Sequence, residues 1–259
     1  MLSFTSPVME GYSMGDDSLD TFVEVLHRFT LERDRLGGTV LEQFLCYRKE
    51  LLDWNTHVNL TAITTPEEVL TRHFLDSLSV LKVYNKPRAH LLDIGSGAGF
   101  PGLPLKIVRP QWEVVLLEAT GKKVTFLRHM IETLHLENVV AIQGRAEEFA
   151  HKQEYRATFD VVTARAVASL PTLLEYAAPF CRVHGQIVLL KKGALEDEIT
   201  LGKRAAKEVG TVLKSDVAVT LPGLTDGRRL LVWEQQKLCP KQYPRGGATM
   251  AKNPLGVRS

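Results

Sequence analysis

The chain has 259 residues, of which 44% are hydrophobic and 24% are charged, a composition typical of globular proteins and unlike that of disordered or collagen-like chains. The formal net charge of +2 is too small to indicate a nucleic-acid partner by itself. No apolar run approaches the roughly 20 residues of a membrane span, and the first 17 residues carry no Lys or Arg, as an export signal would require. We therefore expect a cytoplasmic protein that does not contact a membrane.

The N-terminal third of the chain is predicted to be mainly helical. Residues 1–18 are polar and rich in turn-forming residues, so we predict a disordered leader there. From residue 19 onward, apolar residues recur at helical spacing. Thr65, Pro66 and Glu68 form a capping box, with Thr65 as the N-cap. The sequence therefore predicts a helical extension over residues 19–85.

Beyond Asn85-Lys86-Pro87, strand-like runs alternate with helical runs. The predicted strands are His90–Ile94, Glu113–Leu117, Val139–Gln143, Asp160–Ala164, Gln186–Leu190, Val209–Val219 and Arg229–Glu234. The predicted helices are Leu103–Val108, Lys122–Leu134, Thr172–Cys181 and Glu196–Glu208. This alternation indicates an α/β fold with a parallel sheet wrapped by helices, and the final hairpin adds an antiparallel edge. Residues 86–236 are thus predicted to form one domain around a seven-strand, mostly parallel, Rossmann-like sheet.

One loop of this domain is predicted to bind a cofactor. Within Leu91–Gly102, a buried strand leads directly into three alternating glycines, Gly95, Gly97 and Gly99. Glycine lets the backbone turn sharply and lets a ligand approach main-chain atoms. Ligands of open α/β sheets bind at the carboxyl ends of the strands, where this loop lies.

Two interpretations of this loop differ in the cofactor. Gly97-x-Gly99-x-x-Gly102 matches the dinucleotide fingerprint of oxidoreductases, with Glu118 about 20 residues further on as the ribose-binding acid. The segment from Asp93 to Gly99 instead has the acid-led form D-x-G-x-G-x-G of S-adenosylmethionine methyltransferases. A dinucleotide fingerprint should begin with glycine where the strand ends, yet Asp93 and Gly95 occupy that place. We therefore favour the methyltransferase.

The two acids beside the loop suit such a ligand. Glu118 ends the apolar run Val114–Leu117, and ribose hydroxyls would supply the hydrogen bonds that a carboxylate needs at the end of a buried strand. Asp93 is expected either to meet the cationic amino-acid end of the cofactor or to cap the following helix.

Several segments together resemble the glucose-inhibited division protein B family, the bacterial small-subunit (16S) ribosomal RNA guanine-N7 methyltransferases. The resemblance covers roughly residues 40–255. The matching segments are Trp54-Asn55, Val58-Asn59-Leu60-Thr61, residues 72–78, Pro101-Gly102-Leu103-Pro104, Leu127-Arg128, residues 144–149, residues 164–170 and Tyr243-Pro244-Arg245. The resemblance implies a class I methyltransferase fold that transfers a methyl group from S-adenosylmethionine to N7 of a guanine in small-subunit ribosomal RNA.

The resemblance also implies which residues contact S-adenosylmethionine. They are Gly95, Phe100, Glu118, Ala119, Thr120, Ala146, Glu147 and Arg165, and the loop itself adds Asp93, Gly97 and Gly99. Ala146 and Glu147 follow the third strand, where this fold meets the adenine ring. Arg165 ends the fourth strand, which faces the transferable methyl group.

Guanine N7 carries an in-plane lone pair and no proton, so it can attack a sulfonium methyl group without a general base. We therefore predict catalysis by positioning, with Arg165 and Lys191 as the catalytic residues that orient the guanine. Lys192 is a further candidate for guanine or phosphate contact. Where exocyclic-amine methyltransferases have an Asn/Asp-Pro-Pro-aromatic loop, this chain has Thr163-Ala164-Arg165-Ala166, which argues against an amine target.

Cysteine and metal chemistry are not expected. Cys46, Cys181 and Cys239 are widely spaced without a Cys-x-x-Cys pair, so we interpret them as reduced thiols. Cys181 lies in a predicted helix and the other two cysteines lie outside the main domain. We therefore expect none of the three to act as a nucleophile. His73 and Asp76 have no third ligand nearby, so we interpret them as a hydrogen-bonding pair on a helix at the interface with the sheet and predict no metal.

Residues 237–259 form a basic tail that contains five Lys or Arg residues and no acid. The alternative to a role in binding is a disordered terminus. Because Tyr243-Pro244-Arg245 is part of the resemblance, we predict that Lys241 and Arg245, together with Lys192, contact phosphates of the ribosomal RNA or ribosomal subunit. We expect a monomer. A non-catalytic RNA-binding module stays open as a further alternative, and it predicts RNA affinity without methyl transfer.

Overall fold

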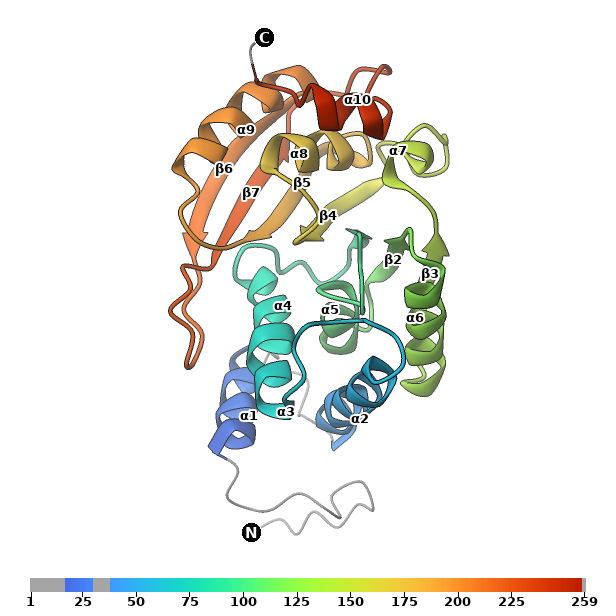
Figure 1. The fold of residues 1–259 in the computed structure, drawn as a ribbon, viewed down its shortest axis with the longest axis vertical. Coiled ribbons are helices and arrows are strands. Elements are labelled where there is room, and N and C mark those ends of the chain that lie inside the picture. The colour runs from blue at the N-terminus through green and yellow to red at the C-terminus, as the bar shows by residue number, and fades with distance from the viewer. Residues whose placement is uncertain (1–16, 30–37, 258–259) are drawn as a thin grey trace.

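The computed structural model describes residues 17–29 and 38–257 (Figure 1). The N-terminal elements are α1 (Asp17–Phe29), α2 (Gly38–Asn55), α3 (Pro66–Glu68), the π-helical stretch η2 (Val69–Leu75), α4 (Asp76–Leu78) and the 3-10 turn η3 (Ser79–Lys82). The helical extension is therefore present. Helix α1 begins two residues before the predicted end of the leader, and residues 1–16 of that leader lie outside the described residues. Thr65 caps α3 as predicted, because its hydroxyl accepts a hydrogen bond from the backbone N–H of Glu68.

The sheet has seven strands, as predicted. They are β1 (His90–Ile94), β2 (Glu113–Glu118), β3 (Val139–Gln143), β4 (Phe159–Arg165), β5 (Cys181–Lys191), β6 (Thr211–Ala218) and β7 (Arg229–Gln235). Their order is β3-β2-β1-β4-β5-β7-β6; β1 to β5 pair in parallel, and β7 runs antiparallel to both β5 and β6. The order reverses between β1 and β4, which is where open α/β sheets bind ligands.

The remaining helices are α5 (Gly102–Val108), α6 (Gly121–Thr133), α7 (Ala146–Phe149), α8 (Leu170–Ala177), α9 (Glu196–Val209) and α10 (Gly247–Lys252). The predicted helix Thr172–Cys181 is wrong at its C-terminal end, because α8 stops at Ala177 and Cys181 already belongs to β5. Pro179 explains the difference, since proline has no backbone N–H to continue the helical hydrogen bonds.

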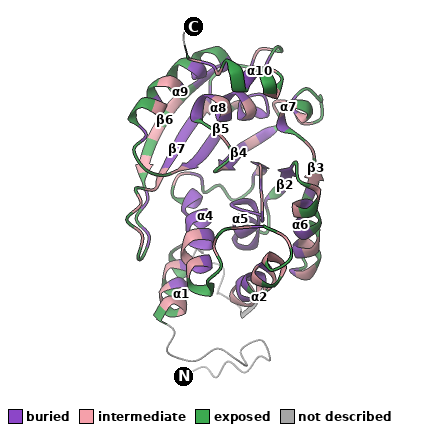
Figure 2. Ribbon diagram, in the orientation of Figure 1, coloured by how far each residue is buried: buried purple, intermediate pink, exposed green. Residues whose placement is uncertain are grey.

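Two apolar cores lie on opposite faces of the sheet (Figure 2). Successive residues of a strand point to opposite faces, so Leu91 of β1 belongs to one core and Leu92 to the other. Helices α5 and α6 cover the first face, together with the N-terminal helices, and α8 and α9 cover the second face. Phe22 of α1, Phe44 of α2 and Phe74 of η2 pack on one another in the first core. The helical extension and the sheet therefore share one core.

The C-terminal tail is packed against the second face. Cys239, Tyr243 and Leu255 are buried in the second core, and α10 lies near α8 and α9 at the upper end of Figure 1. The side chain of Arg156 donates hydrogen bonds to three carbonyl groups of the tail, at residues 239, 240 and 243. Residues 237–257 are thus part of the folded domain rather than a disordered terminus.

None of the helices in the described part of the chain is both long and apolar enough to cross a bilayer.

Candidate functional site

The glycine loop connects β1 to α5 and is held by the predicted acid at the end of β1. Gly95, Gly97 and Gly99 adopt φ angles of +65°, +60° and +100°, which L side chains rarely adopt. Asp93 is fully buried: one carboxylate oxygen accepts a hydrogen bond from the backbone N–H of Gly102 at 3.1 Å, and the other accepts one from the hydroxyl of Thr163 at 3.0 Å. Asp93 therefore closes the loop back onto its own strand.

Burial also changes the acidity of Asp93. Desolvation raises the pKa of its carboxyl from 3.8 to about 7, although the hydrogen bonds from Thr163 and Gly102 work in the opposite direction. Both carboxylate oxygens of Asp93 are bonded to protein groups, so the side chain fixes the conformation of the glycine loop.

Glu118 at the end of β2 holds the glycine loop from the neighbouring strand. Its Oε2 accepts a hydrogen bond from the N–H of Gly97 at 3.0 Å, and its Oε1 accepts one from the N–H of Thr120 at 2.8 Å. Each oxygen retains a second acceptor site. Ala119 and Thr120 are exposed beside it, at the carboxyl edge of the sheet. The role of Glu118 as a ribose-binding acid stays a prediction.

A cavity of about 170 Å³ opens next to this loop. It is lined by Ile94, Gly95, Leu117, Ala119, Gly144, Arg145, Ala146, Glu147, Val167 and Tyr176. Four of the predicted cofactor contacts are thus brought together. A Cβ atom at Gly95 would lie 2.7 Å from Cγ2 of Val167, so the wall of the cavity requires glycine there. The lining is largely apolar with a few polar groups, among them the carboxylate of Glu147, as in sites that bind small molecules.

A second cavity, of about 660 Å³, lies between the N-terminal elements and the ends of β4, β5 and β7. It is lined by Thr61, Ala62, Ile63, Glu68, Arg72, His73, Asp76, Arg165, Ala166, Leu190, Lys191, Lys192 and Arg228. Five of these residues are basic and two are acidic. The residue pair Ala166 and Val167 separates the two cavities, since Ala166 lines the second and Val167 the first. Ala166 has a φ of +57°, an uncommon conformation for alanine.

Arg165 is held in place at the end of β4 by three partners. Its guanidinium donates hydrogen bonds to the carbonyl of Arg72 and to the carboxylate of Asp76, each at 3.1 Å, and to Nδ1 of His73 at 3.0 Å. It also lies 4.9 Å from the ring centroid of Phe100. Only 16% of the side chain is exposed. Arg165 thus has little freedom of position in the wall of the second cavity.

His73 is neutral in this arrangement. Burial and the charge of Arg165 lower the pKa of its imidazole to about 2. Because Arg165 donates to Nδ1, the proton is on Nε2, which donates to the hydroxyl of Thr61 at 2.8 Å. The predicted pairing of His73 with Asp76 is indirect, since both residues contact Arg165.

Phe100 lies on the side of the loop that faces the helical extension. Its ring is stacked between those of His73, at 4.2 Å, and Tyr47, at 5.4 Å. The hydroxyl of Tyr47 also donates a hydrogen bond to the carbonyl of Ala98. Only 4% of Phe100 is exposed, so little of its side chain is open to a cofactor.

The two lysines after β5 differ in their surroundings. Lys191 donates hydrogen bonds to the carboxylate of Glu198 at 2.8 Å and to the carbonyl of Ala168 at 3.4 Å. Glu198 in turn accepts a hydrogen bond from the N–H of Leu170. Lys191 therefore supports the loop that follows Arg165, whereas Lys192 is exposed at the cavity.

Sequence reasoning missed Arg228 and Glu68 as parts of this site. Arg228 precedes β7 and forms an ion pair with Asp76 at 2.7 Å. Glu68 was recognised only as a helix cap, yet it lines the second cavity. A basic residue just before a strand and an acid in a first helical turn are both common at the protein surface, so neither residue was recognisable from the sequence as part of a site.

The structure agrees with the absence of cysteine chemistry. Burial raises the pKa of Cys181 and of Cys239 to about 12, and it raises that of Cys46 as well. None of the three lines either cavity. Within residues 17–29 and 38–257, no group of three His, Cys, Asp or Glu side chains is arranged to hold a metal ion.

The two tail residues predicted to bind RNA have different environments. Lys241 is exposed. The side chain of Arg245 forms a two-pronged ion pair with the carboxylate of Glu175, with both N–O distances at 2.8 Å, and Glu175 is fully buried. Arg245 thus anchors the tail to α8.

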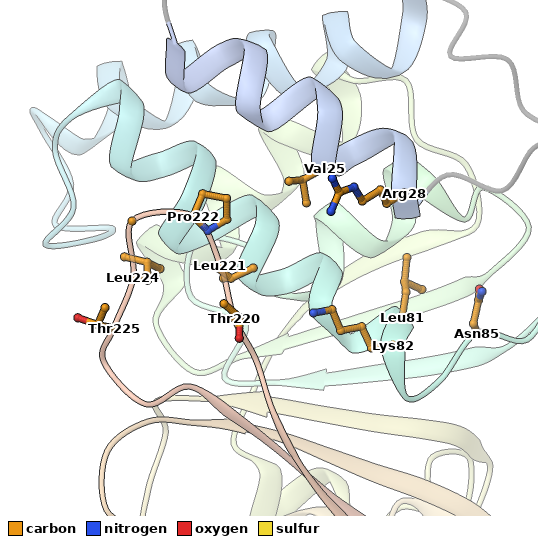
Figure 3. Close-up of a pocket in the computed structure, with 11 residues that line it drawn as sticks. Val25, Arg28, Leu81, Lys82, Asn85, Thr220, Leu221, Pro222, Leu224 and Thr225 are labelled. Carbon is orange, nitrogen blue, oxygen red and sulfur yellow. The ribbon is translucent and has the colours of Figure 1, made fainter.

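A third cavity, of about 890 Å³, lies between α1, η3 and the turn that precedes β7 (Figure 3). Its walls include Val25, Leu81, Leu221 and Leu224. None of the predicted site residues lines it, so it is separate from the cofactor loop.

Comparison with known proteins assigns this architecture to one group. A family model described as "rRNA small subunit methyltransferase G" matches residues 40–225. A protein of the same name from Roseiflexus sp. (strain RS-1) is 45% identical over 221 residues, which cover 85% of this chain and 94% of the relative. Another, from Lactococcus lactis subsp. cremoris (strain MG1363), is 41% identical over 239 residues, which cover 91% of this chain and 98% of the relative.

Solved structures share the fold at low sequence identity. A methyltransferase from Pyrococcus furiosus matches with a TM-score of 0.53 and 18% identity, over 75% of this chain and 97% of that one. A putative transferase from Pyrococcus horikoshii matches with a TM-score of 0.51 and 17% identity, over 63% of each chain.

Proposed function

Because the chain belongs to the rRNA small subunit methyltransferase G family, we propose that it transfers a methyl group from S-adenosylmethionine to N7 of a guanine in small-subunit ribosomal RNA. The observation that carries this proposal is that two cavities lie at the carboxyl edge of the sheet with the consecutive residues Ala166 and Val167 in their walls. One suits an adenosine and the other is a basic pocket large enough for a nucleotide.

S-adenosylmethionine supplies an electrophilic methyl group when it is bound. The loop residues Gly95 and Gly97, together with Glu118, would hold its ribose and methionine parts. Ala146 and Glu147 would border its adenine. Asp93 fixes the conformation of the loop. When its carboxyl is ionised, its negative charge would stabilise the cationic S-adenosylmethionine bound at the loop.

The target guanine is proposed to occupy the second cavity, next to Arg165. The guanidinium of Arg165 is fixed by Asp76 and His73, so it can donate a hydrogen bond to O6 from a defined position and leave the lone pair of N7 free to attack. Lys191 braces the loop that follows Arg165, and exposed Lys192 is available to a phosphate.

N7 methylation needs no proton acceptor. In this proposal, the only imidazole among the described residues that line the second cavity, that of His73, is not available as one. The imidazole of His73 is buried and already hydrogen-bonded at both nitrogen atoms. Proximity and orientation are therefore the main contributions of the protein to the rate.

The protein is proposed to act as a monomer in the cytoplasm, on ribosomal RNA or the small ribosomal subunit. Exposed Lys241 is a candidate for further RNA contact. The comparisons give no support to a dinucleotide-dependent oxidoreductase or to a non-catalytic RNA-binding module.

The test is transfer of a labelled methyl group from S-adenosylmethionine to unmodified small-subunit RNA or subunits. Borohydride and aniline treatment then cleaves the chain at 7-methylguanine. We expect cleavage at a single guanine, and none in large-subunit RNA as the matched control. Label without cleavage would retain the methyltransferase but reject N7 as the acceptor, and RNA binding without label would support the binding module instead.

A further inference from the structure

A carboxylate lines the proposed nucleotide cavity without a role in the mechanism described above. The cavity has two acids in its wall, Glu68 and Asp76. Guanine differs from adenine on its Watson–Crick edge, where it presents two donors, N1–H and the N2 amino group. A carboxylate accepts such a pair of hydrogen bonds, so each acid is a candidate for reading that edge.

Asp76 is not free to do so. Its Oδ1 is paired with Arg228 at 2.7 Å, its Oδ2 is paired with Arg165 at 3.1 Å, and only 6% of its side chain is exposed. Both oxygens serve to hold the two arginines.

Glu68 is held in position but remains accessible, with 44% of its side chain exposed. Its Oε1 accepts from Nε of Arg72 at 3.0 Å, and its Oε2 accepts from the hydroxyl of Thr65 at 3.2 Å. A carboxylate has about four acceptor sites, so about two remain open. The capping box that starts α3 thus also fixes a carboxylate at the wall of the cavity.

The order of residues along the helical segment sets the orientation of a bound base. Glu68, Arg72 and Asp76 follow at steps of four residues, and all three line the cavity. Arg165 lies at the Asp76 end, next to the cofactor cavity. A guanine whose O6 accepts from Arg165 presents its neighbouring N1–H and N2 edge to the rest of the cavity, where Glu68 lies.

We propose that Glu68 determines specificity for guanine by accepting hydrogen bonds from N1–H and the N2 amino group of the target base. This inference rests on the proposed function and identifies the side chain that selects the target guanine. Adenine would place the lone pair of its N1 against the carboxylate and would be rejected.

The experiment compares guanine with inosine at the target position of a synthetic small-subunit RNA. Inosine keeps N7, O6 and N1–H and lacks only the N2 amino group. With wild-type protein, we expect kcat/KM for methylation to be about 10-fold or more lower with inosine than with guanine. In Glu68→Ala, the ratio of kcat/KM with guanine to kcat/KM with inosine should fall to within about twofold of one. The reason is that the carboxylate that accepts from the N2 amino group is absent.

Three variants separate recognition from helix capping. Glu67→Ala removes an exposed carboxylate from the same turn that does not line the cavity, and it should keep the wild-type ratio. Thr65→Ala weakens the cap and releases Oε2 of Glu68 but keeps the carboxylate, so the ratio should stay well above that of Glu68→Ala. Glu68→Gln preserves the size of the side chain if Glu68→Ala does not fold, and it should lower the ratio at least about threefold, since one acceptor becomes a donor.

Equal rates on guanine and inosine with the wild-type protein, or an unchanged ratio in the Glu68 variants, would overturn the role of Glu68 and leave N7 methylation in place. If the wild-type protein methylates neither RNA while retaining its fold, the proposed function fails and this inference fails with it.

Discussion

Glu118 is the residue on which cofactor affinity should depend most directly. Its carboxylate holds the N–H groups of Gly97 and Thr120 and has acceptor sites left for a ribose. Glu118→Ala should raise the dissociation constant of S-adenosylmethionine about 10- to 150-fold, which corresponds to about 1.5–3 kcal/mol for a charge-assisted hydrogen bond. Titration calorimetry measures this change. Glu113→Ala, at the exposed opposite end of β2, is the matched control. Equal affinity in the two variants would contradict the assignment.

Arg165 should affect turnover more than cofactor affinity, because it lies where the two cavities meet. Arg165→Ala should lower the single-turnover rate of RNA methylation about 10- to 100-fold at saturating cofactor and RNA, since the attack geometry loosens. Arg182 provides a control, because it is also an arginine paired with an acid, Asp160, but at the start of β5. If the rate for Arg165→Ala is within about twofold of the wild-type rate, Arg165 does not contribute to methyl transfer and the assignment is wrong.

Asp93 should give the protein a measurable pH dependence of stability. Burial raises the pKa of its carboxyl from 3.8 to about 7. Between these values the folded protein holds a proton that the unfolded chain has lost, so stability falls as pH rises, by at most about 1.4 kcal/mol per pH unit. Asp93→Asn cannot ionise and should lack this contribution.

Urea unfolding between about pH 4 and pH 7 measures the effect of Asp93 as the difference between wild type and variant. The Asp53→Asn variant changes an exposed residue of α2 and should follow the wild type. Parallel stability curves for wild type and Asp93→Asn would rule out the raised pKa.

Much of the cofactor side of the site was predictable at the residue level, because it follows from where strands end. Asp93, Gly95 and Glu118 are adjacent in the structure since parallel strands bring their carboxyl ends to one edge. The stacking of Phe100 between Tyr47 and His73 was not predictable, because it depends on how a distant helical segment packs on the loop.

At the level of elements, the strands were predictable from short apolar runs between turns, and β1 and β3 have the predicted bounds. The packing of the tail was not. Its composition resembles a solvated terminus, whereas its position depends on long-range contacts such as the ion pair between Arg245 and buried Glu175 and the hydrogen bonds from Arg156. Local sequence contains no information about these partners.

The tail ion pair should contribute strongly to stability. Arg245→Ala leaves the carboxylate of Glu175 buried without its charged partner, and we expect a loss of about 3–5 kcal/mol in the free energy of unfolding. Thermal or urea unfolding measures it. Lys241→Ala, at an exposed position of the same tail, should change stability by less than about 0.5 kcal/mol. A similarly small effect of Arg245→Ala would show that the tail is held by its apolar contacts alone.

The molecule as a whole should unfold in one step, because the helical extension and one face of the sheet share a core. Trp54 of α2 reports on this, since its ring lies 5.4 Å from that of Phe126 in α6. With Trp112 and Trp233 replaced by Phe, the fluorescence of Trp54 and the far-UV circular dichroism should show the same urea midpoint. A lower midpoint for the fluorescence would identify the extension as a separately folding unit.

The shared core has a consequence for the order of events during synthesis. Residues 17–85 leave the ribosome first, but Phe22, Phe44 and Phe74 pack in a core that is completed only by later residues such as Phe126 and Leu127. At about 5–20 residues per second, about 40 further residues take about 2–8 s to be made. During that interval the nascent extension exposes an apolar surface with nothing to cover it, which makes this segment a natural target for chaperones that bind emerging chains.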